Sequence, residues 1–338
     1  MDTIFSTVEE LLKPSEALIA DMASLEGDIL ILGVGGKIGP SLAKLAKQAV
    51  DASGVPRRVI GVSRLSEPGL REELEAAGVE AIAADLLNEA DLASLPDAKN
   101  VLYLAGTKFG TTGKEAFTWA MNAYLPGRVA EKYRNSKIVV YSTGNVYPLV
   151  PVFSGGADES TPTGPIGEYA QSSLGRERIF EHFSQQYGTE LLIYRLNYAN
   201  DLRYGVLLEI CKSVVNESPI DLRMGHVNVI WQGDANEYAL RSFLHTSNPA
   251  KYLNITGPET ASVRWIAEEF GKLAGKTPQF VNQESDTALL SNAGESFRLF
   301  GYPKVTLRDM IRMTLEWFQG GGATIKKPTH FQTRTGKF

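Results

Sequence analysis

The sequence predicts an α/β protein built on a doubly wound parallel sheet, with a smaller lobe toward the C-terminus. Up to about residue 198, short apolar runs alternate with segments of helical periodicity. The runs are apolar at successive positions, which indicates strands buried on both faces and therefore a sheet covered by helices on both sides. After about residue 198 the alternation becomes less regular, and this change predicts the smaller lobe.

The expected elements can be placed in chain order by their periodicity. Strands of the sheet are expected at 28–32, 58–62, 79–83, 101–104, 138–141 and 191–194. The helices between them are expected at about 42–49, at 72–77, as one long helix at 115–134, and at 169–187. In the lobe, short strands are expected at 227–231 and 251–255, and helices at 263–274 and 306–318.

Both ends of the chain lie outside this pattern. Residues 1–27 are interpreted as a helical extension, interrupted at Pro14, in which Ser15 caps a helix over 16–25. The simplest interpretation is a helix that packs on the domain or on a partner subunit. At the other end, three glycines and a polar, basic sequence predict a flexible tail over 319–338.

Composition excludes several classes of function. The chain has 338 residues and a net charge of −5, and an acidic balance argues against nucleic acid as a partner. Cys211 is the only cysteine, and the four histidines show no ligand spacing, so no metal site is expected. No stretch approaches the ~20 apolar residues that span a bilayer. The N-terminus also lacks a secretion signal, so we expect a cytoplasmic protein without a membrane partner.

A glycine-rich loop lies directly between the first expected strand and the first expected helix. Gly33, Gly36 and Gly39 are spaced as G-x-x-G-x-x-G, whereas the commoner G-x-G-x-x-G would need glycine where Ile38 stands. Such a loop brings backbone N–H groups and a helix N-terminus close to a pyrophosphate. The loop, with Lys37 and Ile38, therefore predicts dinucleotide binding. A plain tight turn between strand and helix is the alternative.

The end of the second strand bears on the choice of cofactor. An acid there would hydrogen-bond the ribose 2′-hydroxyl of NAD, whereas a basic residue would accept the 2′-phosphate of NADP. Ser63 and Arg64 stand at this point, so NADP is preferred over NAD, with a solvated loop arginine as the alternative. Further along the expected path of the cofactor lie residues at the ends of the third and fourth strands, namely Asp85, Leu86, Ala105 and Gly106.

The order of motifs resembles the extended short-chain dehydrogenase/reductase family, which includes nucleotide-sugar epimerases, dehydratases and reductases. The resemblance covers about residues 28–318. It rests on eight ordered motifs, which include the glycine loop, Asp85-Leu86, 104–106, Asn122, 141–147, 158–169, Arg195-Leu-Asn197 and 254–257. It implies a Rossmann-like dinucleotide-binding domain at 28–198 and, at 199–318, mainly a substrate lobe with elements that return to the sheet. It also implies a small-molecule substrate of the sugar or polyhydroxy type, with Asn122 and Asn197 near the cofactor.

The family's chemistry uses a Tyr-x-x-x-Lys pair together with a serine or threonine. The resemblance assigns the acid/base role to Tyr169 and the hydroxyl that positions the substrate oxygen to Thr143. Ser173 stands where the lysine belongs, and a serine can hydrogen-bond ribose but supplies no positive charge. Arg176 shares this helix face and could lend charge, or it could form a structural ion pair or lie at the surface. A tyrosine without acid/base duty also remains an alternative.

Four other residues are candidates for contact with substrate. They are Lys108, Asn145, Arg223 and His226, and each could instead be an ordinary loop residue. The helices at 115–134 and 169–187 match the family's dimer interface, which predicts a homodimer. Their apolar residues could serve the core or that interface. Because of Ser173, a non-catalytic dinucleotide-binding regulator or complex subunit is the main alternative to an enzyme, and lyase or hydrolytic chemistry is a third.

Overall fold

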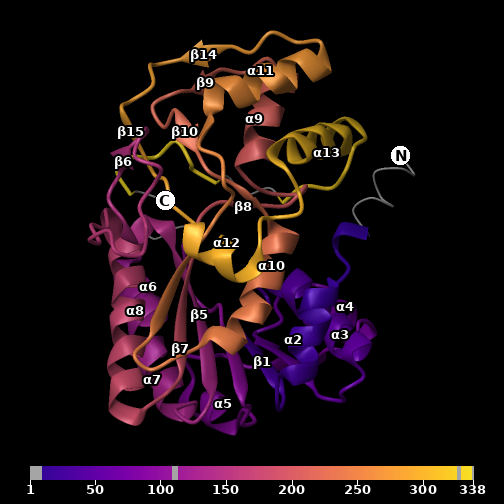
Figure 1. Ribbon diagram of the computed structural model, residues 1–338, viewed down its shortest axis with the longest axis vertical. Helices are drawn as coiled ribbons and strands as arrows, with labels where there is room; N and C mark the ends of the chain where they lie inside the picture. The colour runs from indigo at the N-terminus through magenta and orange to yellow at the C-terminus, as the bar shows by residue number, and fades with distance from the viewer. Residues whose placement is uncertain (1–9, 109–112, 326–328, 337–338) are drawn as a thin grey trace.

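The computed structural model describes residues 10–108, 113–325 and 329–336, and its centre is a seven-stranded parallel sheet (Figure 1). The strands lie in the order β12-β7-β5-β4-β1-β2-β3, and every neighbouring pair is parallel. Their bounds are β1 Ile29–Leu32, β2 Val59–Ser63, β3 Glu80–Ala83, β4 Asn100–Tyr103, β5 Lys137–Thr143, β7 Leu191–Leu196 and β12 Lys251–Ile255. The doubly wound sheet predicted from the sequence is confirmed.

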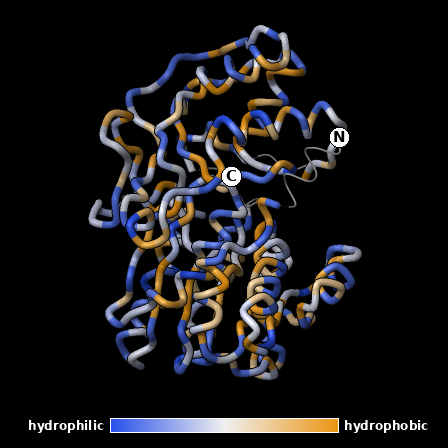
Figure 2. The backbone as a smooth tube through the Cα atoms, turned by 45° about the vertical axis from the view of Figure 1, so that its right-hand side comes forward, coloured by the Kyte–Doolittle hydropathy of each residue, from blue (hydrophilic) through white to orange (hydrophobic). Residues whose placement is uncertain are grey.

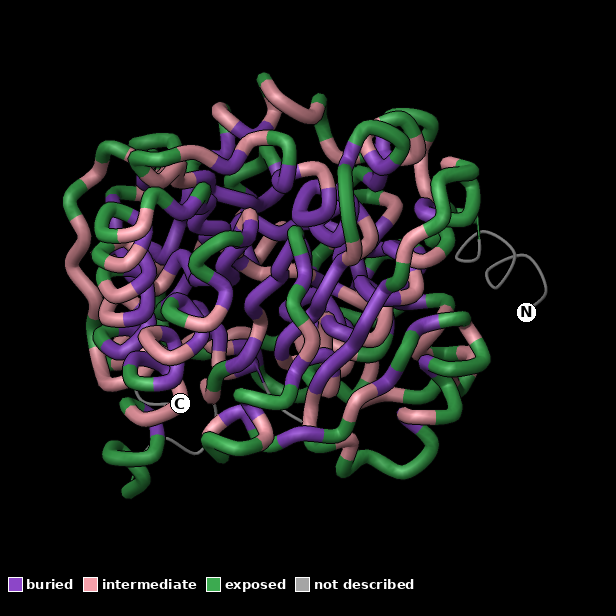
Figure 3. Tube along the Cα trace, turned by 90° about the horizontal axis from the view of Figure 1, so that it is seen from below, coloured by how far each residue is buried: buried purple, intermediate pink, exposed green. Residues whose placement is uncertain are grey.

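Helices cover both faces of the sheet because successive strand residues point to opposite sides. On β1, Ile29 and Ile31 belong to one buried cluster, whereas Leu30 and Leu32 belong to the cluster on the other face. The first cluster includes residues of α2 (Glu16–Ser24), α3 (Gly39–Ser53), α4 (Leu70–Ala76) and α10 (Gln232–Arg241). The second includes residues of α5 (Glu89–Ser94), α7 (Leu125–Lys132) and α8 (Gly167–Tyr187). Buried residues accordingly fill the middle of the molecule in Figure 3, and exposed residues surround them.

The N-terminal helix forms as the sequence predicts. Ser15 is the N-cap of α2, and its Oγ accepts a hydrogen bond from the N–H of Leu18 over 3.1 Å. Leu18 and Met22 are fully buried, and Met22 lies with α3 residues in the same cluster. Arg241 of α10 donates to Asp21 over 2.7 Å, so α2 is joined to the sheet domain by polar as well as apolar contacts.

The segment predicted as one long helix at 115–134 is helical without a break over 115–132, but it consists of three consecutive segments. These are α6 (Glu115–Trp119), the π-helical turn η1 (Ala120–Tyr124) and α7. Pro126 lies at the start of α7 and has no N–H to donate to the carbonyl of Asn122, which interrupts the α-helical hydrogen-bond pattern. Single π-turns are frequent at functional sites, and Asn122 is buried in the middle of this one.

The C-terminal lobe has its own core, formed mainly by α9 (Val206–Val215), α11 (Val263–Ala274) and α13 (Leu307–Gln319). Apolar and polar residues alternate along these helices in Figure 2, as expected when one helix face is buried. Four pairs of two-residue strands complete the lobe and its join to the sheet domain. They are β6 (Val150–Pro151) with β15 (Thr287–Ala288), β8 (Ala199–Asn200) with β11 (Ile230–Trp231), β9 (Ile220–Asp221) with β14 (Phe280–Val281), and β10 (His226–Val227) with β13 (Ala261–Ser262).

The single strand predicted at 227–231 is therefore wrong, because β10 and β11 pair with different partners. The helices predicted at 263–274 and 306–318 are confirmed, and Thr306 caps α13 by accepting from the N–H of Asp309. The remaining short helices are η2 (Gly144–Val146), η3 (Ser242–His245) and α12 (Gly294–Phe300). Within the described ranges, no helix is long and apolar enough to cross a membrane.

The C-terminal segment makes contacts that its composition did not predict. Phe331 is 2% exposed and belongs to the core of the lobe. Thr329 Oγ1 lies 2.8 Å from Glu209 Oε2, and Arg334 donates to the carbonyl and the hydroxyl of Thr287 over 2.6 Å each. The sequence predicts a flexible tail over 319–338, whereas residues 329–336 are held by these tertiary contacts, which follow no local periodicity.

Candidate active site

A cavity of about 260 Å³ lies where the sheet meets the lobe. Residues that follow the carboxyl ends of β1, β4, β5 and β7 line it, among them Ile38, Gly106, Asn145 and Asn197. Tyr204, just before α9, lines it from the lobe. Ligands of open α/β sheets bind outside the carboxyl ends of the strands, so this cavity is the candidate site.

Gly33, Gly36 and Gly39, the three glycines of the G-x-x-G-x-x-G pattern after β1, differ in what a side chain would meet at each position. Gly33 has φ +97°, and a Cβ added there would lie 2.6 Å from the N atom of Ala105. A Cβ on Gly39 would lie 2.1 Å from the carbonyl oxygen of Val34, so α3 can approach the loop only through a glycine. By contrast, a Cβ on Gly36 meets nothing closer than 3.5 Å. Gly36 therefore presents an open backbone.

The N-terminus of α3 is suited to an anion. None of the described side chains caps it, and its first turn contains no acid, so no described group neutralises the positive end of the helix dipole locally. Together with the open backbone at Gly36, this arrangement fits the pyrophosphate of a dinucleotide. Lys37 and Ile38 both line the cavity, and Lys37 Nζ lies 3.3 Å from the centroid of the Tyr204 ring.

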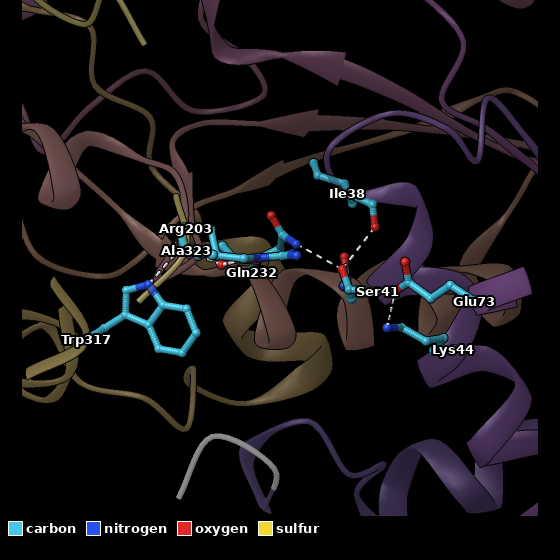
Figure 4. A network of polar contacts seen from close by, with 10 residues as sticks. Ile38, Ser41, Lys44, Glu73, Arg203, Gln232, Trp317 and Ala323 are labelled. Carbon is cyan, nitrogen blue, oxygen red and sulfur yellow. Dashed lines mark hydrogen bonds and ion pairs between the residues drawn. The ribbon is translucent and has the colours of Figure 1, made fainter. Parts of the chain in front are cut away.

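The start of α3 is tied to α10 through Ser41. Ser41 Oγ donates to the carbonyl of Ile38 over 3.0 Å and accepts from Gln232 Nε2 and Asn236 Nδ2 over 2.9 Å each. Figure 4 shows Gln232 pointing toward Ser41 across the gap between the two helices. Because Gln232 also lines the cavity, these bonds hold the loop and the lobe side of the site in one arrangement.

The predicted reactive groups meet in the same cavity. Thr143 ends β5, Tyr169 lies in the first turn of α8, and both line the cavity. Asn145 donates to Thr143 Oγ1 from its backbone N over 3.2 Å and from its Nδ2 over 2.9 Å. The neighbouring Ser142 instead donates to the buried carboxylate of Glu177. Both residues line the cavity, but the Ser142 hydroxyl donates its proton to Glu177, which leaves the Thr143 hydroxyl as the candidate for substrate contact.

Sequence comparison agrees with this geometry. The family model described as "NAD dependent epimerase/dehydratase family" matches residues 29–199. The chain belongs to this family. No curated protein sequence matches the chain.

Solved structures of similar fold are numerous. UDP-glucose 4-epimerase of Thermus thermophilus in complex with NAD is 20% identical, with a TM-score of 0.70, covering 87% of this chain and 99% of the other. UDP-glucuronic acid 4-epimerase of Bacillus cereus, in complex with UDP-glucuronic acid and NAD, is 19% identical at the same TM-score and coverage. dTDP-glucose 4,6-dehydratase of Bacillus anthracis with NAD is 17% identical, with a TM-score of 0.70, covering 87% of this chain and 96% of the other. These structural similarities show that the chain shares the fold of these proteins.

In this epimerase/dehydratase family member, Ser173 does not line the cavity. It is fully buried, and its Oγ donates to the carbonyl of Tyr169 over 2.7 Å. A short hydroxyl side chain inside a helix often bonds to the carbonyl one turn back, which turns it away from ligands. The structure therefore gives no support to the predicted contact between Ser173 and ribose.

Arg176 occupies neither of the positions that the sequence favoured for it. It is 6% exposed and lines the cavity. Its Nη1 donates to the carbonyl of Tyr141 over 2.8 Å, and its Nη2 donates to Asn122 Oδ1 over 2.9 Å. Among the described residues, these partners are neutral, so Arg176 is neither a surface residue nor a member of a structural ion pair.

Asn122 organises the surroundings of Arg176 from the π-turn. Its Oδ1 also accepts from the N–H of Thr107 over 2.9 Å, and its Nδ2 donates to the Thr107 carbonyl over 2.9 Å and to Ser172 Oγ over 3.0 Å. The predicted cofactor residue Asn122 is thus fully buried and holds the loop after β4 in place. Asn197 lines the cavity and donates to Asn228 Oδ1 over 3.0 Å.

Lys108 brings a further basic group to the cavity. Its Nζ lies 5.5 Å from the centroid of the Tyr169 ring, and both residues line the cavity. Desolvation by burial lowers the pKa of Lys108 to about 8, although the nearby carboxylate of Glu209 raises it. The sequence named Lys108 as a substrate candidate, and its place beside Tyr169 is consistent with that interpretation.

A buried ion pair stabilises the strand ends beneath the cavity. Arg195 Nη2 of β7 and Glu177 Oε2 of α8 are 2.7 Å apart, with both side chains at most 4% exposed. Arg195 Nη1 also donates to the Tyr147 hydroxyl over 2.7 Å. Sequence reasoning placed Arg195 in a family motif but did not identify its partner, because the two residues lie on separate elements.

The residues predicted to contact the adenosine part of the cofactor differ in how exposed they are. Arg64 is exposed after β2, and Ser63 Oγ accepts from the N–H of Leu65 over 3.2 Å. Asp85 is exposed and accepts from the N–H of Leu87, whereas Leu86 is buried in the core. Ala105 and Gly106 follow β4 with little side chain, as expected.

Arg223 and His226 do not line the cavity. Arg223 is exposed and pairs with Asp221 over 2.6 Å. The His226 ring lies on β10 with its Nδ1 buried. Conversely, the sequence did not single out several residues that do line the cavity, namely Tyr198, Tyr204, Gln232 and Thr329. Tyr198 directly follows the motif Arg195-Leu-Asn197, and Tyr204 lies six residues further on, so this motif could have indicated that both tyrosines lie near the site. No local feature of the sequence indicates Thr329.

Proposed function

We propose that this protein binds a nicotinamide dinucleotide and catalyses hydride transfer on a sugar or sugar-derived polyhydroxy substrate, as an epimerase, dehydratase or oxidoreductase. The observation that carries the proposal is the meeting of Thr143 and Tyr169 in one cavity whose other side is the glycine loop. The solved structures named above contain NAD, and one also contains a nucleotide sugar. They support a nucleotide sugar as the first substrate class to test.

The position of each residue in the cavity suggests its role in binding or catalysis. The backbone of the glycine loop and Lys37 would hold the pyrophosphate, and the bound nicotinamide would accept or donate hydride. Tyr169 exchanges the proton of the reacting hydroxyl or carbonyl, and Thr143 donates a hydrogen bond to that oxygen. Asn145 keeps the Thr143 hydroxyl in place through the bonds described above. Positioned acid/base groups of this kind contribute about 10²–10⁴ in rate.

The choice between NADP and NAD is a finer part of the proposal. Arg64 is exposed after β2 and no acid stands beside it, which favours the 2′-phosphate of NADP. The solved structures of similar fold named above hold NAD, which favours the other dinucleotide. Both cofactors therefore belong in the binding experiment. Arg64→Glu should weaken NADP binding and leave NAD binding intact.

A homodimer is proposed on the face formed by α6 and η1. Three large apolar side chains are exposed there, Phe117, Trp119 and Tyr124, at 47%, 39% and 61%. An interface on this face would cover them. Sedimentation of the wild type and of Tyr124→Glu would test this, because the charged side chain should shift the protein toward monomer.

The experiment that tests the function combines binding with turnover. The protein is titrated with NAD, NADH, NADP and NADPH, and then screened with UDP-hexoses, UDP-uronic acids and dTDP-glucose for epimerised, dehydrated or oxidised product. The active substrate is then tested with Tyr169→Phe and with the matched control Tyr187→Phe, which lies at the other end of α8. Turnover that only Tyr169→Phe abolishes supports the proposal.

Two results would contradict the enzyme assignment. Tight dinucleotide binding without turnover on a broad panel would favour a regulator or complex subunit, a role consistent with the serine at 173. Absence of dinucleotide binding would overturn both functions.

A further inference from the structure

Arg176 is a buried cation at the wall of the candidate active site, and none of the residues that the structure describes gives it a carboxylate partner. Its guanidinium hydrogen-bonds only to the Tyr141 carbonyl and Asn122 Oδ1 among the described residues, and its Nε has no hydrogen-bond partner there. A guanidinium has more N–H donors than two bonds use. Burying a charge without a counter-charge is unfavourable unless other groups satisfy it. Nη1 and Nη2 each keep a second N–H, and because Arg176 lines the cavity, we take these as the donors for a ligand there, whereas Nε is buried.

The local structure is adapted to this guanidinium. A Cβ placed on Gly106 would lie only 2.3 Å from Arg176 Nη2, so a glycine is needed where the chain leaves β4. Asn122 fixes both the Thr107 backbone and Arg176. These contacts come from β4, β5, η1 and α8, which means that the guanidinium has one defined place in the cavity wall.

Helix geometry explains how Arg176 can replace a charge missing one turn earlier. Side chains on a helix lean toward its N-terminus, so a long residue covers the surface over the preceding turn. Arg176 follows Ser173 by three positions on α8, and Ser173 is turned into the helix by its bond to Tyr169. The guanidinium can thus act on the cavity from a position further along α8.

We propose that Arg176 binds the ribose on the nicotinamide side of the dinucleotide and supplies the positive charge that position 173 lacks. This inference rests on the proposed function. The chemical reason is that a fixed guanidinium donates several hydrogen bonds to neighbouring hydroxyl oxygens, which a serine hydroxyl bonded to its own helix does not. The alternative is a purely structural role, in which Arg176 joins β5 to η1 through its hydrogen bonds and does not contact the ligand.

Two ligands separate these roles. ADP-ribose contains the second ribose, whereas ADP ends at the pyrophosphate, so the ratio of their dissociation constants isolates the ribose contact. Calorimetry measures both ligands with wild type and with Arg176→Gln. Loss of this contact should lower the preference for ADP-ribose about tenfold while ADP affinity stays the same, as for one charge-assisted hydrogen bond. The matched control is Arg178→Gln, because Arg178 is exposed on the same helix and its ion pair among the described residues is with Glu181.

Two further variants keep the test informative if Arg176→Gln is unstable. Gly106→Ala should displace the guanidinium without removing charge, and should lower the same preference. Ser173→Lys combined with Arg176→Gln returns the charge to position 173 and should restore much of the preference for ADP-ribose. Circular dichroism and the melting temperature establish that each variant is folded.

Each outcome bears on the assignment. A selective loss of ADP-ribose affinity in Arg176→Gln and Gly106→Ala, with recovery in the double variant, supports it. If the variants lose affinity for ADP-ribose and ADP equally, Arg176 has a purely structural role and the assignment is overturned. An unchanged preference for ADP-ribose over ADP also overturns it. A wild type that binds neither ligand, and neither NAD nor NADP, overturns the proposed function itself, a result distinct from a variant that binds normally.

Discussion

The hydroxyl of Ser173 donates a hydrogen bond to the backbone carbonyl of Tyr169 over 2.7 Å. Ser173, which the resemblance places at the position of the family's lysine, is thereby turned into its own helix, one turn beyond the tyrosine that lines the cavity. The positive charges at the cavity wall belong instead to Arg176, to Lys108 on the loop after β4 and to Lys37 of the glycine loop. The site retains cations near Tyr169 although none stands at position 173.

We expect Ser173→Lys alone to destabilise the protein by about 1–3 kcal/mol, because it overfills a fully buried position and places a second cation near Arg176. Urea unfolding measures this cost. The loss should be smaller when Arg176 is also changed to Gln, since the like charge is then absent. An equal loss in both backgrounds would show that the two positions do not interact.

Gly36→Ala and Gly39→Ala should separate ligand binding from folding. A Cβ on Gly39 would lie 2.1 Å from the Val34 carbonyl oxygen, so Gly39→Ala should cost about 1–3 kcal/mol of stability as well as dinucleotide affinity. Gly36→Ala meets no close neighbour and should fold normally, yet its methyl group would obstruct a phosphate. Urea unfolding and dinucleotide titration test both. Unchanged affinity in Gly36→Ala would contradict the assigned role of this loop.

Removing one partner of the buried pair between Glu177 and Arg195 should be strongly destabilising. Glu177→Gln leaves the Arg195 charge uncompensated in the interior, which costs about 3–5 kcal/mol. The exposed pair of Arg178 and Glu181 on the same helix provides the control, and Glu181→Gln should cost at most about 1 kcal/mol. Chemical denaturation measures the free energy of unfolding of the two variants. Similar losses in both would contradict the prediction that the buried pair matters more than the exposed one.

Lys108 predicts a specific pH dependence of stability. Its pKa is lowered from 10.5 to about 8 by burial, so between these values the unfolded chain holds a proton that the folded protein has released. Stability rises with pH wherever the unfolded state binds more protons, so this residue's contribution becomes more favourable from about pH 8 to 10.5. Below pH 8 the folded protein carries the full cost of the buried charge.

The comparison of wild type with Lys108→Met isolates this contribution. The variant should be the more stable protein near pH 7, and its advantage should diminish as the pH rises toward 10.5. Urea unfolding across this range measures the difference. A difference that stays constant with pH would mean that Lys108 has an ordinary pKa in the folded protein.

Local sequence predicted much of the architecture. The strands of the sheet domain and the helix over 263–274 lie where apolar periodicity placed them, and the Ser15 and Thr306 caps form as expected. The helix expected at 115–134 also forms, but the sequence did not predict its π-turn, which precedes the proline of α7 and contains the buried Asn122. Local sequence failed at 227–231, because the pairing of two-residue strands depends on distant partners.

By itself, the sequence determined the order of strands and helices, the glycine loop and the presence of Tyr169 and Thr143, because these depend on residues close together in the chain. Only the tertiary structure decided which charges face the cavity. Arg176 meets Asn122 across 54 positions, and Thr329 meets Glu209 across 120. Such contacts depend on how whole elements pack, so no spacing in the sequence reveals that Arg176 lines the cavity while the Ser173 hydroxyl bonds to its own helix.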